Sequence, residues 1–501
     1  MIEVIKKNRS YFAYAFVFTL MAHFIKFVNY YPTWDSMFAI ELKWGDMIPS
    51  GRWFGAPPAI ILSSKYDLQW VAGIVAAFFI SVLSVLIVEL FDIKQKLSRL
   101  IAISLFSVFP TFASSFSYGF MIPTYMLALS FACFAVFVCI KGNKKAGLAI
   151  AIILMTLSLG AYQIYLLFAT AMMAIFVAKM LLQKECDKNM IKRIVIRFLI
   201  TVIASLLLYF IINKSLQIIF GQNLSDNQGI DQIGIMSAEN LISGVGKIIV
   251  STGSFFLGKK AVTVYGIINV VIIILFVILY FNKVLLNKEY KVSHKLLITV
   301  LFVGVIPITY AYYLVSPGVL YHRVMELGNY LVYFIAIILL DMEKPEEEFK
   351  LFRIKTVLPI LLCVLTFYHF VNDNIAYHQM SISYEKTYYE ISELMTRIDE
   401  ANPDQLKKLC IVGNFQYGDE DDIYTIPQIT GANTDNFLHD ERHIFLFANH
   451  YLNRPYVSCT EEEKERILAK TDIDKLSAFP YGNCIEIVDD IIVVKLPGRN
   501  Y

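Results

Sequence analysis

Long apolar segments separated by short polar ones dominate the first 371 residues of this 501-residue chain. A helix that crosses a bilayer needs about 20 consecutive, mostly apolar residues. Eleven segments meet this requirement or come close to it, so the pattern predicts a polytopic membrane protein with a mainly α fold. The predicted spans are residues 11–30, 69–91, 99–117, 121–140, 146–162, 163–182, 195–213, 264–282, 296–315, 327–341 and 356–371.

The last 130 residues follow a different pattern, which is typical of a soluble α/β domain. The predicted elements are helices 381–400 and 461–469, a strand 409–412 and a hairpin 485–496 that turns at Asp489-Asp490. The predicted helix 381–400 places on one face Tyr384, Tyr388, Ile391, Leu394 and Ile398. We therefore expect two domains, a transmembrane domain over 1–371 and a soluble domain over 372–501.

Composition supports this division. Hydrophobic residues make up 57% of the chain and charged residues 17%, which excludes a disordered chain, a secreted disulfide scaffold and an ordinary cytosolic enzyme. From Val371 onward there are 23 acidic and 12 basic residues, whereas the preceding part has 19 acidic and 32 basic residues. The tail is therefore acidic and the membrane part is basic.

The distribution of Lys and Arg predicts the orientation, since cytoplasmic loops carry the excess of positive charge. Six alternate loops contain 22 Lys and Arg residues, and the outside loops before the tail contain only 8. With eleven spans, this pattern predicts a cytoplasmic N-terminus and an extracytoplasmic tail. The predicted inside segments are 1–10, 92–99, 141–145, 183–197, 283–295 and 342–355.

Several common kinds of chemistry have no support in the sequence. It contains no dinucleotide-binding, Walker or nucleophile-elbow motif, and nothing in it indicates nucleic-acid binding. No His or Cys spacing matches a zinc site, so we expect no metal-binding residues. The tail holds Cys410, Cys459 and Cys484 without a CxxC motif, and whether two of them form a disulfide stays open.

Two long outside loops, 31–68 and 214–263, are expected to carry function. The first contains Asp35 and Asp46, and a carboxylate beside a membrane helix can act as a general base. Arg52 can hold a phosphate through two parallel hydrogen bonds, and Trp34 can stack on a sugar. The alternative is a solvated loop whose Trp residues only anchor it at the membrane interface.

Three further polar positions lie at predicted outside ends of spans. Tyr162 and Gln163 join two apolar segments and could bind a sugar, although such a Gln more often bonds between helices. Arg323 could hold a phosphate, or pair with Glu326 at the surface. Lys259 could meet a lipid phosphate or serve as an interfacial anchor.

The order of two short motifs resembles a known family. Gly51-Arg52-Trp53 ends an Asp-bearing outside loop, and the segment 157–163 (Leu-Ser-Leu-Gly-Ala-Tyr-Gln) precedes another span. Together with topology and length, they resemble the Gtr-type polytopic bacterial glucosyltransferases over about residues 10–370. The resemblance implies a GT-C-like fold, a polyprenyl-phosphate sugar donor and inversion at the anomeric carbon. It also implies Asp35 as the base. Ser36 follows where many members have a second acidic residue, and Asp46 could replace it.

The resemblance also implies the partners and the location. Glucose, or a related hexose, would pass from undecaprenyl phosphate to a surface or cell-wall polysaccharide outside the bacterial cytoplasmic membrane. A donor synthase and a flippase would supply the lipid-linked sugar. Arg52, Arg323 and Lys259 would bind the donor phosphate, and Trp34, Tyr162 and Gln163 the sugar or acceptor. No cofactor is required, although Mg²⁺ or Mn²⁺ is compatible with GT-C enzymes.

Two other kinds of protein fit part of the sequence. A transporter or flippase of lipid-linked sugars would show internal repeats and charges near the bilayer midplane. No repeat is evident, although Lys26 and His23 lie in the first span. A non-catalytic cell-envelope assembly protein would tolerate the loss of Asp35, Arg52 and Gln163 together.

Overall fold

The computed structural model describes residues 2–63, 67–142, 144–183, 187–225, 238–258, 264–316, 318–342, 349–415, 429, 431–432, 435–438 and 440–498. Its contacts divide the chain into two units. The first unit is Met1–Asn29, Leu42–Asn374 and Thr425–Ile429. The second unit is Tyr30–Glu41, Ile375–Tyr424 and Thr430–Tyr501, so it includes a segment of the first predicted outside loop as well as the tail.

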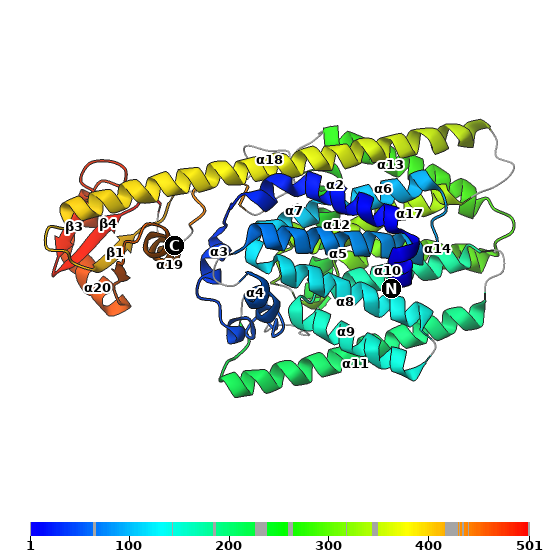
Figure 1. Ribbon diagram of the computed structural model, residues 1–501, viewed down its shortest axis with the longest axis horizontal. Coiled ribbons are helices and arrows are strands. Elements are labelled where there is room, and N and C mark those ends of the chain that lie inside the picture. Colours follow the sequence, from blue (N-terminus) through cyan, green and yellow to red (C-terminus); the bar gives the residue numbers. More distant parts are fainter. Residues whose placement is uncertain are drawn as a thin grey trace. The chain divides into compact units, whose positions relative to one another are not determined.

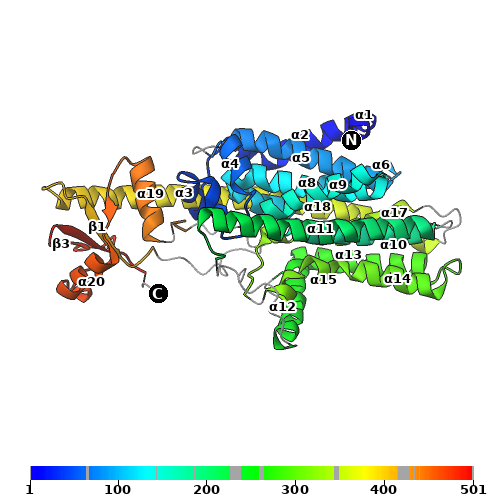
Figure 2. The same cartoon turned by 90° about the horizontal axis from the view of Figure 1, so that it is seen from below.

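The first unit is a bundle of helices that lie side by side (Figures 1 and 2). α5 (Gln69–Leu90) contacts both α2 (Arg9–Val28) and α8 (Ile122–Lys141), and α9 (Lys145–Ala161) contacts both α8 and α11 (Lys188–Phe220). The other helices of this unit are α1 (Ile2–Lys7), η1 (Trp44–Met47), α4 (Ala56–Ser63), α6 (Lys96–Ser107), α7 (Pro110–Ser117), η3 (Gly119–Met121), α10 (Tyr165–Leu181), α12 (Ala238–Leu257), α13 (Val264–Tyr280), η5 (Phe281–Leu285), α14 (Val292–Val303), α15 (Val305–Thr309), α16 (Tyr312–Val315), η6 (Arg323–Met325), η7 (Leu327–Asn329) and α17 (Tyr330–Asp341).

The helices confirm the predicted apolar segments. In the described part of the chain, nine helices are long and apolar enough to cross a membrane, and three shorter apolar ones accompany them. Each of the eleven segments predicted as spans coincides with helices of the first unit or with the first part of α18 (Phe349–Ala401). The shorter apolar helices correspond to the predicted spans 146–162, 163–182 and 327–341. The chain is therefore mainly helical and compatible with a membrane protein.

α11 shows the distribution of side chains that a membrane helix needs. The Asp187 side chain accepts two backbone N–H bonds at its start, and Gly221 ends it in the left-handed conformation at φ 63°. Its exposed face is apolar and includes Ile200, Ile203, Leu207 and Ile211. Its buried face includes Thr201, Ser205, Tyr209 and Asn213. Apolar residues outside and polar residues inside are typical of a helix that faces lipid.

Two helices differ from their sequence-based descriptions. Residues 248–257 belong to the predicted outside loop 214–263, but they form the second half of a helix, α12, which Figure 2 shows at a steep angle to α13 and α14. Glu239 and Lys247 lower the local hydropathy of the first half of α12, which explains why no span is predicted there. The predicted span 356–371 and the tail helix 381–400 are parts of one helix, α18. The polar residues between them include neither Gly nor Pro, so nothing in the backbone ends the helix there.

The second unit contains a four-stranded sheet in the order β2-β1-β4-β3. β1 (Lys408–Val412) runs parallel to β2 (Val457–Ser458) and to β4 (Ile491–Lys495), and β3 (Ile485–Val488) pairs with β4 as an antiparallel hairpin. Asp489 and Asp490 have φ values of 49° and 61°, as a two-residue type I′ turn requires. The other helices of this unit are α3 (Trp34–Ala39), α19 (Glu441–Tyr451), α20 (Glu461–Lys470) and η8 (Ile473–Lys475).

Apolar side chains cover both faces of this sheet. One core joins α18 and α19 to the sheet and includes Ile391, Leu394, Ile398, Leu409, Ile411, Ile444, Phe447, Ile492 and Val494. The other core joins α20 to the sheet and consists of Cys410, Cys459, Ile467, Ile491 and Val493. The predicted strand, hairpin and tail helices are therefore confirmed, and they form an α/β arrangement.

Candidate active site

A tight loop around Gly51 forms the centre of the first group of site residues. Gly51 has φ 69°, and a Cβ atom there would lie 2.4 Å from the Tyr209 hydroxyl oxygen and 2.9 Å from the Gln163 amide nitrogen. The Tyr209 hydroxyl donates to the Gly51 carbonyl at 3.0 Å. The Gln163 amide donates to the Ser50 carbonyl at 3.2 Å and to the Tyr209 oxygen at 3.0 Å. Only glycine combines this conformation with such a close approach.

The two motifs that carry the family resemblance are in direct contact. The Phe54 N–H donates to the Gly160 carbonyl at 2.7 Å. A Cβ atom on Gly160 would lie 2.4 Å from the ring of Trp53, which is almost fully buried. Trp53 therefore packs closely against the backbone at the end of α9. The Gly-Arg-Trp loop and the segment that contains Gln163 consequently form one structural unit.

Arg52 lies among aromatic side chains at this junction. Its guanidinium carbon is 4.8 Å from the centre of the Tyr162 ring, a cation–π distance. Tyr162 is buried and lies 4.9 Å, centre to centre, from Tyr125. Arg52 is half-buried and thus places a positive charge beside aromatic side chains, where it can attract an anion.

Trp34 and Asp35 lie in the second unit, in the first turn of α3. Trp34 packs edge-on against His443 of α19, with ring centres 5.8 Å apart. The Ser36 hydroxyl accepts the Thr33 N–H at 3.1 Å, so it caps the start of α3. The structure therefore brings Arg52, Tyr162 and Gln163 together in the first unit and places Trp34 and Asp35 in the second.

Two other predicted residues have different surroundings. Asp46 is exposed in η1, where its carboxylate accepts the Lys43 N–H at 2.8 Å. This contact caps the short helix and leaves the second carboxylate oxygen for other roles. Lys259 lies outside the described residues.

Arg323 forms a second group, which is buried rather than superficial. Its Nη1 lies 2.5 Å from a Glu326 carboxylate oxygen, and each side chain is only 8% exposed. The Tyr310 hydroxyl donates to the other Glu326 oxygen at 3.2 Å and accepts from the Asn329 amide at 2.8 Å. Burial raises the pKa of Glu326, and Arg323 opposes that shift. The alternative of an Arg323–Glu326 pair is therefore correct as to the partners but wrong as to the surface, because the pair lies in the interior.

Sequence reasoning missed Asp67, which is almost fully buried just before α5. Burial raises its pKa to about 6, and the nearby charge of Lys26 from α2 opposes the shift. Its carboxylate rests on Gly119, where a Cβ would lie 2.7 Å from one oxygen. The available signal was Lys26 itself, since a cation inside a predicted span needs a partner. Tyr209 was missed because it lies within an apolar segment and only the fold brings it to Gly51.

The described residues contain no group of three or more His, Cys, Asp or Glu side chains that could hold a metal ion. The three tail cysteines are free thiols, and the neighbours Cys410 and Cys459 share the core below α20.

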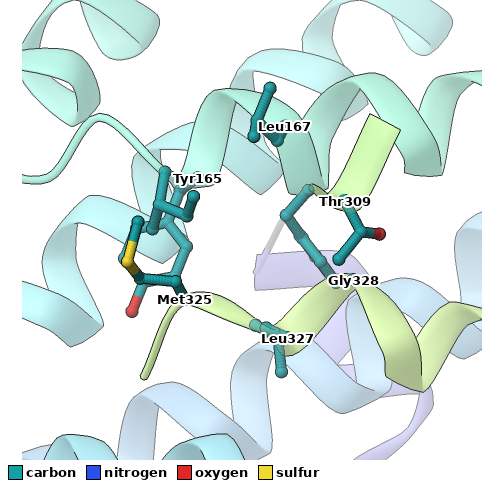
Figure 3. Close-up of a pocket in the computed structure, with 8 residues that line it drawn as sticks. Tyr165, Leu167, Thr309, Met325, Leu327 and Gly328 are labelled. Atoms are coloured by element: carbon teal, nitrogen blue, oxygen red, sulfur yellow. The ribbon is translucent and has the colours of Figure 1, made fainter. Parts of the chain in front are cut away.

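One cavity in the described structure lies between α10 and the segment that follows Arg323 (Figure 3). Tyr165 and Leu167 line one side of it, and Thr309, Met325 and Leu327 line the other. Its volume is about 10 Å³, which is the least that a single water needs. It is therefore a packing defect beside the Arg323 group rather than a substrate pocket.

The sequence matches the family described as Glucosyl transferase GtrII over residues 20–340. No curated protein and no solved structure matches the chain. The matched segment contains the Gly51 loop, the Tyr162-Gln163 turn and the Arg323 group, and it ends before α18. Because the match covers more than half of the sequence, the chain belongs to the GtrII glucosyl transferase family.

Proposed function

We propose that this protein transfers glucose, or a related hexose, from undecaprenyl phosphate to a surface or cell-wall polysaccharide outside the cytoplasmic membrane. The observation that carries the proposal is the contact between the two motifs, which holds the half-buried Arg52 cation against the ring of Tyr162. A cation held there suits the phosphate of a lipid-linked donor.

The proposed reaction is a single inverting displacement. The acceptor hydroxyl oxygen attacks the anomeric carbon from the face opposite the phosphate, and its proton passes to Asp35. The bond between the anomeric carbon and the phosphate oxygen breaks, and its electron pair remains on that oxygen. Arg52 stabilises the negative charge that grows there, and Arg323 can contribute through the part of its guanidinium that Glu326 does not occupy. Because the donor carries its own leaving group, the step needs no cofactor.

The other proposed roles follow the same geometry. Tyr162 and Gln163 lie beside Arg52, so they would contact the sugar or the lipid head group. Trp34 would stack on the acceptor, and the second unit would position the polysaccharide or a protein partner. Asp46 and Lys259 are secondary candidates for the second carboxylate and a phosphate contact.

The alternatives make different predictions. A flippase would move the lipid-linked sugar without forming a product, and an assembly protein would need neither Asp35 nor Arg52. Purified full-length protein in detergent, with a radiolabelled polyprenyl-phosphate sugar and candidate acceptors, separates these functions. We expect a labelled glycan product, and the absence of product with all acceptors and donors would contradict transfer.

The same assay tests the base. Asp35→Asn keeps the size of the side chain but cannot accept the proton, so we expect at least about a hundredfold loss of transfer, the lower range for general-base catalysis. The matched control is Glu41→Gln in the same segment, whose exposed carboxylate lies 3.2 Å from Arg442. Equal activity of Asp35→Asn and the control would show that another group accepts the proton.

A further inference from the structure

The inner face of α18 carries two buried polar residues that the proposed mechanism does not use. His369 and Asp373 are both fully buried, with no exposed surface. They lie four residues apart, so their side chains leave the same face of the helix with about 5–6 Å between Cβ atoms. Both lie beyond residue 340, outside the segment that matches the family.

His369 shares its surroundings with Arg323. Its ring centre lies 5.8 Å from those of Phe109 and Tyr265. Phe109 in turn stacks on Phe255 at 5.7 Å, and the guanidinium of Arg323 lies 4.8 Å from the Phe255 ring. These contacts place His369 of α18 and Tyr265 of α13 around the Arg323 group, within the first unit.

Two hydrogen-bond donors in this region, Arg323 Nε and a ring nitrogen of His369, have no partner among the described residues. Tyr265 and Asn269 lie beside them and interact with each other, and the Asn269 oxygen accepts the Tyr333 hydroxyl at 2.7 Å. Buried donors without acceptors cost folding free energy, so a protein that keeps two of them close together provides a site for an acceptor ligand. A phosphate has several acceptor oxygens and the charge that complements Arg323.

Asp373, in contrast, lacks hydrogen-bond donors for its carboxylate oxygens in the described structure. Both of its carboxylate oxygens are buried, and among the described residues neither has a hydrogen-bond or ion-pair partner. A buried carboxylate without hydrogen-bond partners costs folding free energy. Hydroxyl groups can donate hydrogen bonds to both of its oxygens. One helical turn separates it from His369, a distance comparable with the size of a hexose ring attached to a phosphate.

We propose that this face of α18 binds the head group of a lipid-linked sugar phosphate. His369, Tyr265 and Asn269 join Arg323 around the phosphate, and Asp373 accepts hydrogen bonds from hydroxyls of the sugar. The inference rests on the proposed function for the identity of the ligand, and it adds a specificity-determining residue that the family match does not include.

Binding to full-length protein in detergent tests this assignment. Calorimetry would compare a short-chain polyprenyl-phosphate glucose with the same polyprenyl phosphate lacking the sugar. Asp373→Asn should weaken binding of the glucose-bearing lipid at least about tenfold and leave the sugar-free lipid unchanged. His369→Phe should weaken binding of both lipids, since both carry the phosphate.

Asn374→Ala is the matched structural control. The Asn374 amide donates to the Ala22 carbonyl at 2.9 Å and to the Phe370 carbonyl at 2.8 Å, so it joins α18 to α2 at the same turn of the helix. This variant should bind both lipids as the unchanged protein does. Melting temperatures of all variants show whether each one is folded.

The possible results separate the two proposals. If the unchanged protein binds the glucose-bearing lipid but Asp373→Asn weakens both lipids equally, or neither, the assignment of Asp373 is wrong. If the unchanged protein binds neither lipid, the proposed function fails together with this inference. If Asp373→Asn weakens binding of the glucose-bearing lipid only, but no glycan product forms in the transfer assay, the head-group site is supported and only the transfer reaction is contradicted.

Discussion

Gly51 and Gly160 explain how two motifs more than 100 residues apart in the chain pack together. Each lets a side chain from elsewhere reach the backbone, Tyr209 in one case and Trp53 in the other. Sequence patterns could select Arg52 because Lys and Arg are rare in the predicted outside loops. They could not select Tyr209, since its only distinguishing property is the hydroxyl that the fold brings to Gly51.

Replacement of Gly51 by Ala tests this contact. The new Cβ would lie 2.4 Å from the Tyr209 oxygen, so the loop that carries Arg52 must shift. We expect transfer to fall at least tenfold, since a displacement of about 1 Å can cost about a hundredfold in rate. The control is Gly221→Ala, which has a similar φ of 63° but no atom within 4 Å of the added Cβ. Comparable activity of both variants would mean that the loop tolerates the shift.

The buried Asp67 predicts a dependence of stability on pH. Its pKa is raised from 3.8 to about 6, so the folded state binds the proton more tightly than the unfolded state does. Its contribution is therefore present below pH 4 and is lost as the pH rises to 6, with a total of about 3 kcal/mol. Melting temperatures in detergent should fall over this range relative to those of Asp67→Asn.

Asp92→Asn provides the comparison for that measurement. Asp92 also has a positive φ, 43°, but its side chain is 68% exposed. The melting temperature of this variant should equal that of the unchanged protein at every pH. If the melting temperature of Asp67→Asn also equals that of the unchanged protein at every pH, the carboxylate of Asp67 is solvated in the folded protein, and its burial next to Lys26 is wrong.

At the scale of helices and strands, most of the architecture was predictable because the relevant signals are local. Apolar runs determine the bundle helices, and the alternation around Asp489-Asp490 determines the hairpin. The continuity of α18 was not predictable from hydrophobic periodicity. The segment 372–380 begins in the first unit and ends in the second, so its buried residues do not follow one helical pattern. That missed segment contains Asp373, so the error in the element concealed a candidate site residue.

The hairpin gives a prediction at this scale. Asp490 has φ 61°, a conformation that glycine adopts without the steric cost of a Cβ. Asp490→Gly should therefore stabilise the folded state by about 0.5–1 kcal/mol, measured as a rise in melting temperature. The control is Asp474→Gly in η8, an exposed helical position, where added backbone freedom should destabilise the protein instead. A loss of stability at both positions would contradict the type I′ turn.

For the whole molecule, the division of charge is as informative as the apolar content. The membrane part has few Lys and Arg residues in its predicted outside loops, and Arg52 and Arg323 are among them. The structure holds both against aromatic rings, Arg52 at a half-buried position and Arg323 at a buried one, so both have a role in packing besides their charge. The proposed reaction depends on the predicted orientation, because both groups must face the compartment that contains the acceptor.

Labelling of introduced cysteines in intact cells tests the orientation directly. Glu462→Cys places an exposed thiol at the start of α20, and Lys94→Cys places one in the predicted cytoplasmic loop 92–99. A membrane-impermeant maleimide should label the first variant in intact cells and the second only after permeabilisation. The unchanged protein gives the background from its own cysteines. The opposite pattern would place the second unit inside the cell, where a reaction on the outer surface could not use it, although the chain would still belong to the glucosyl transferase family.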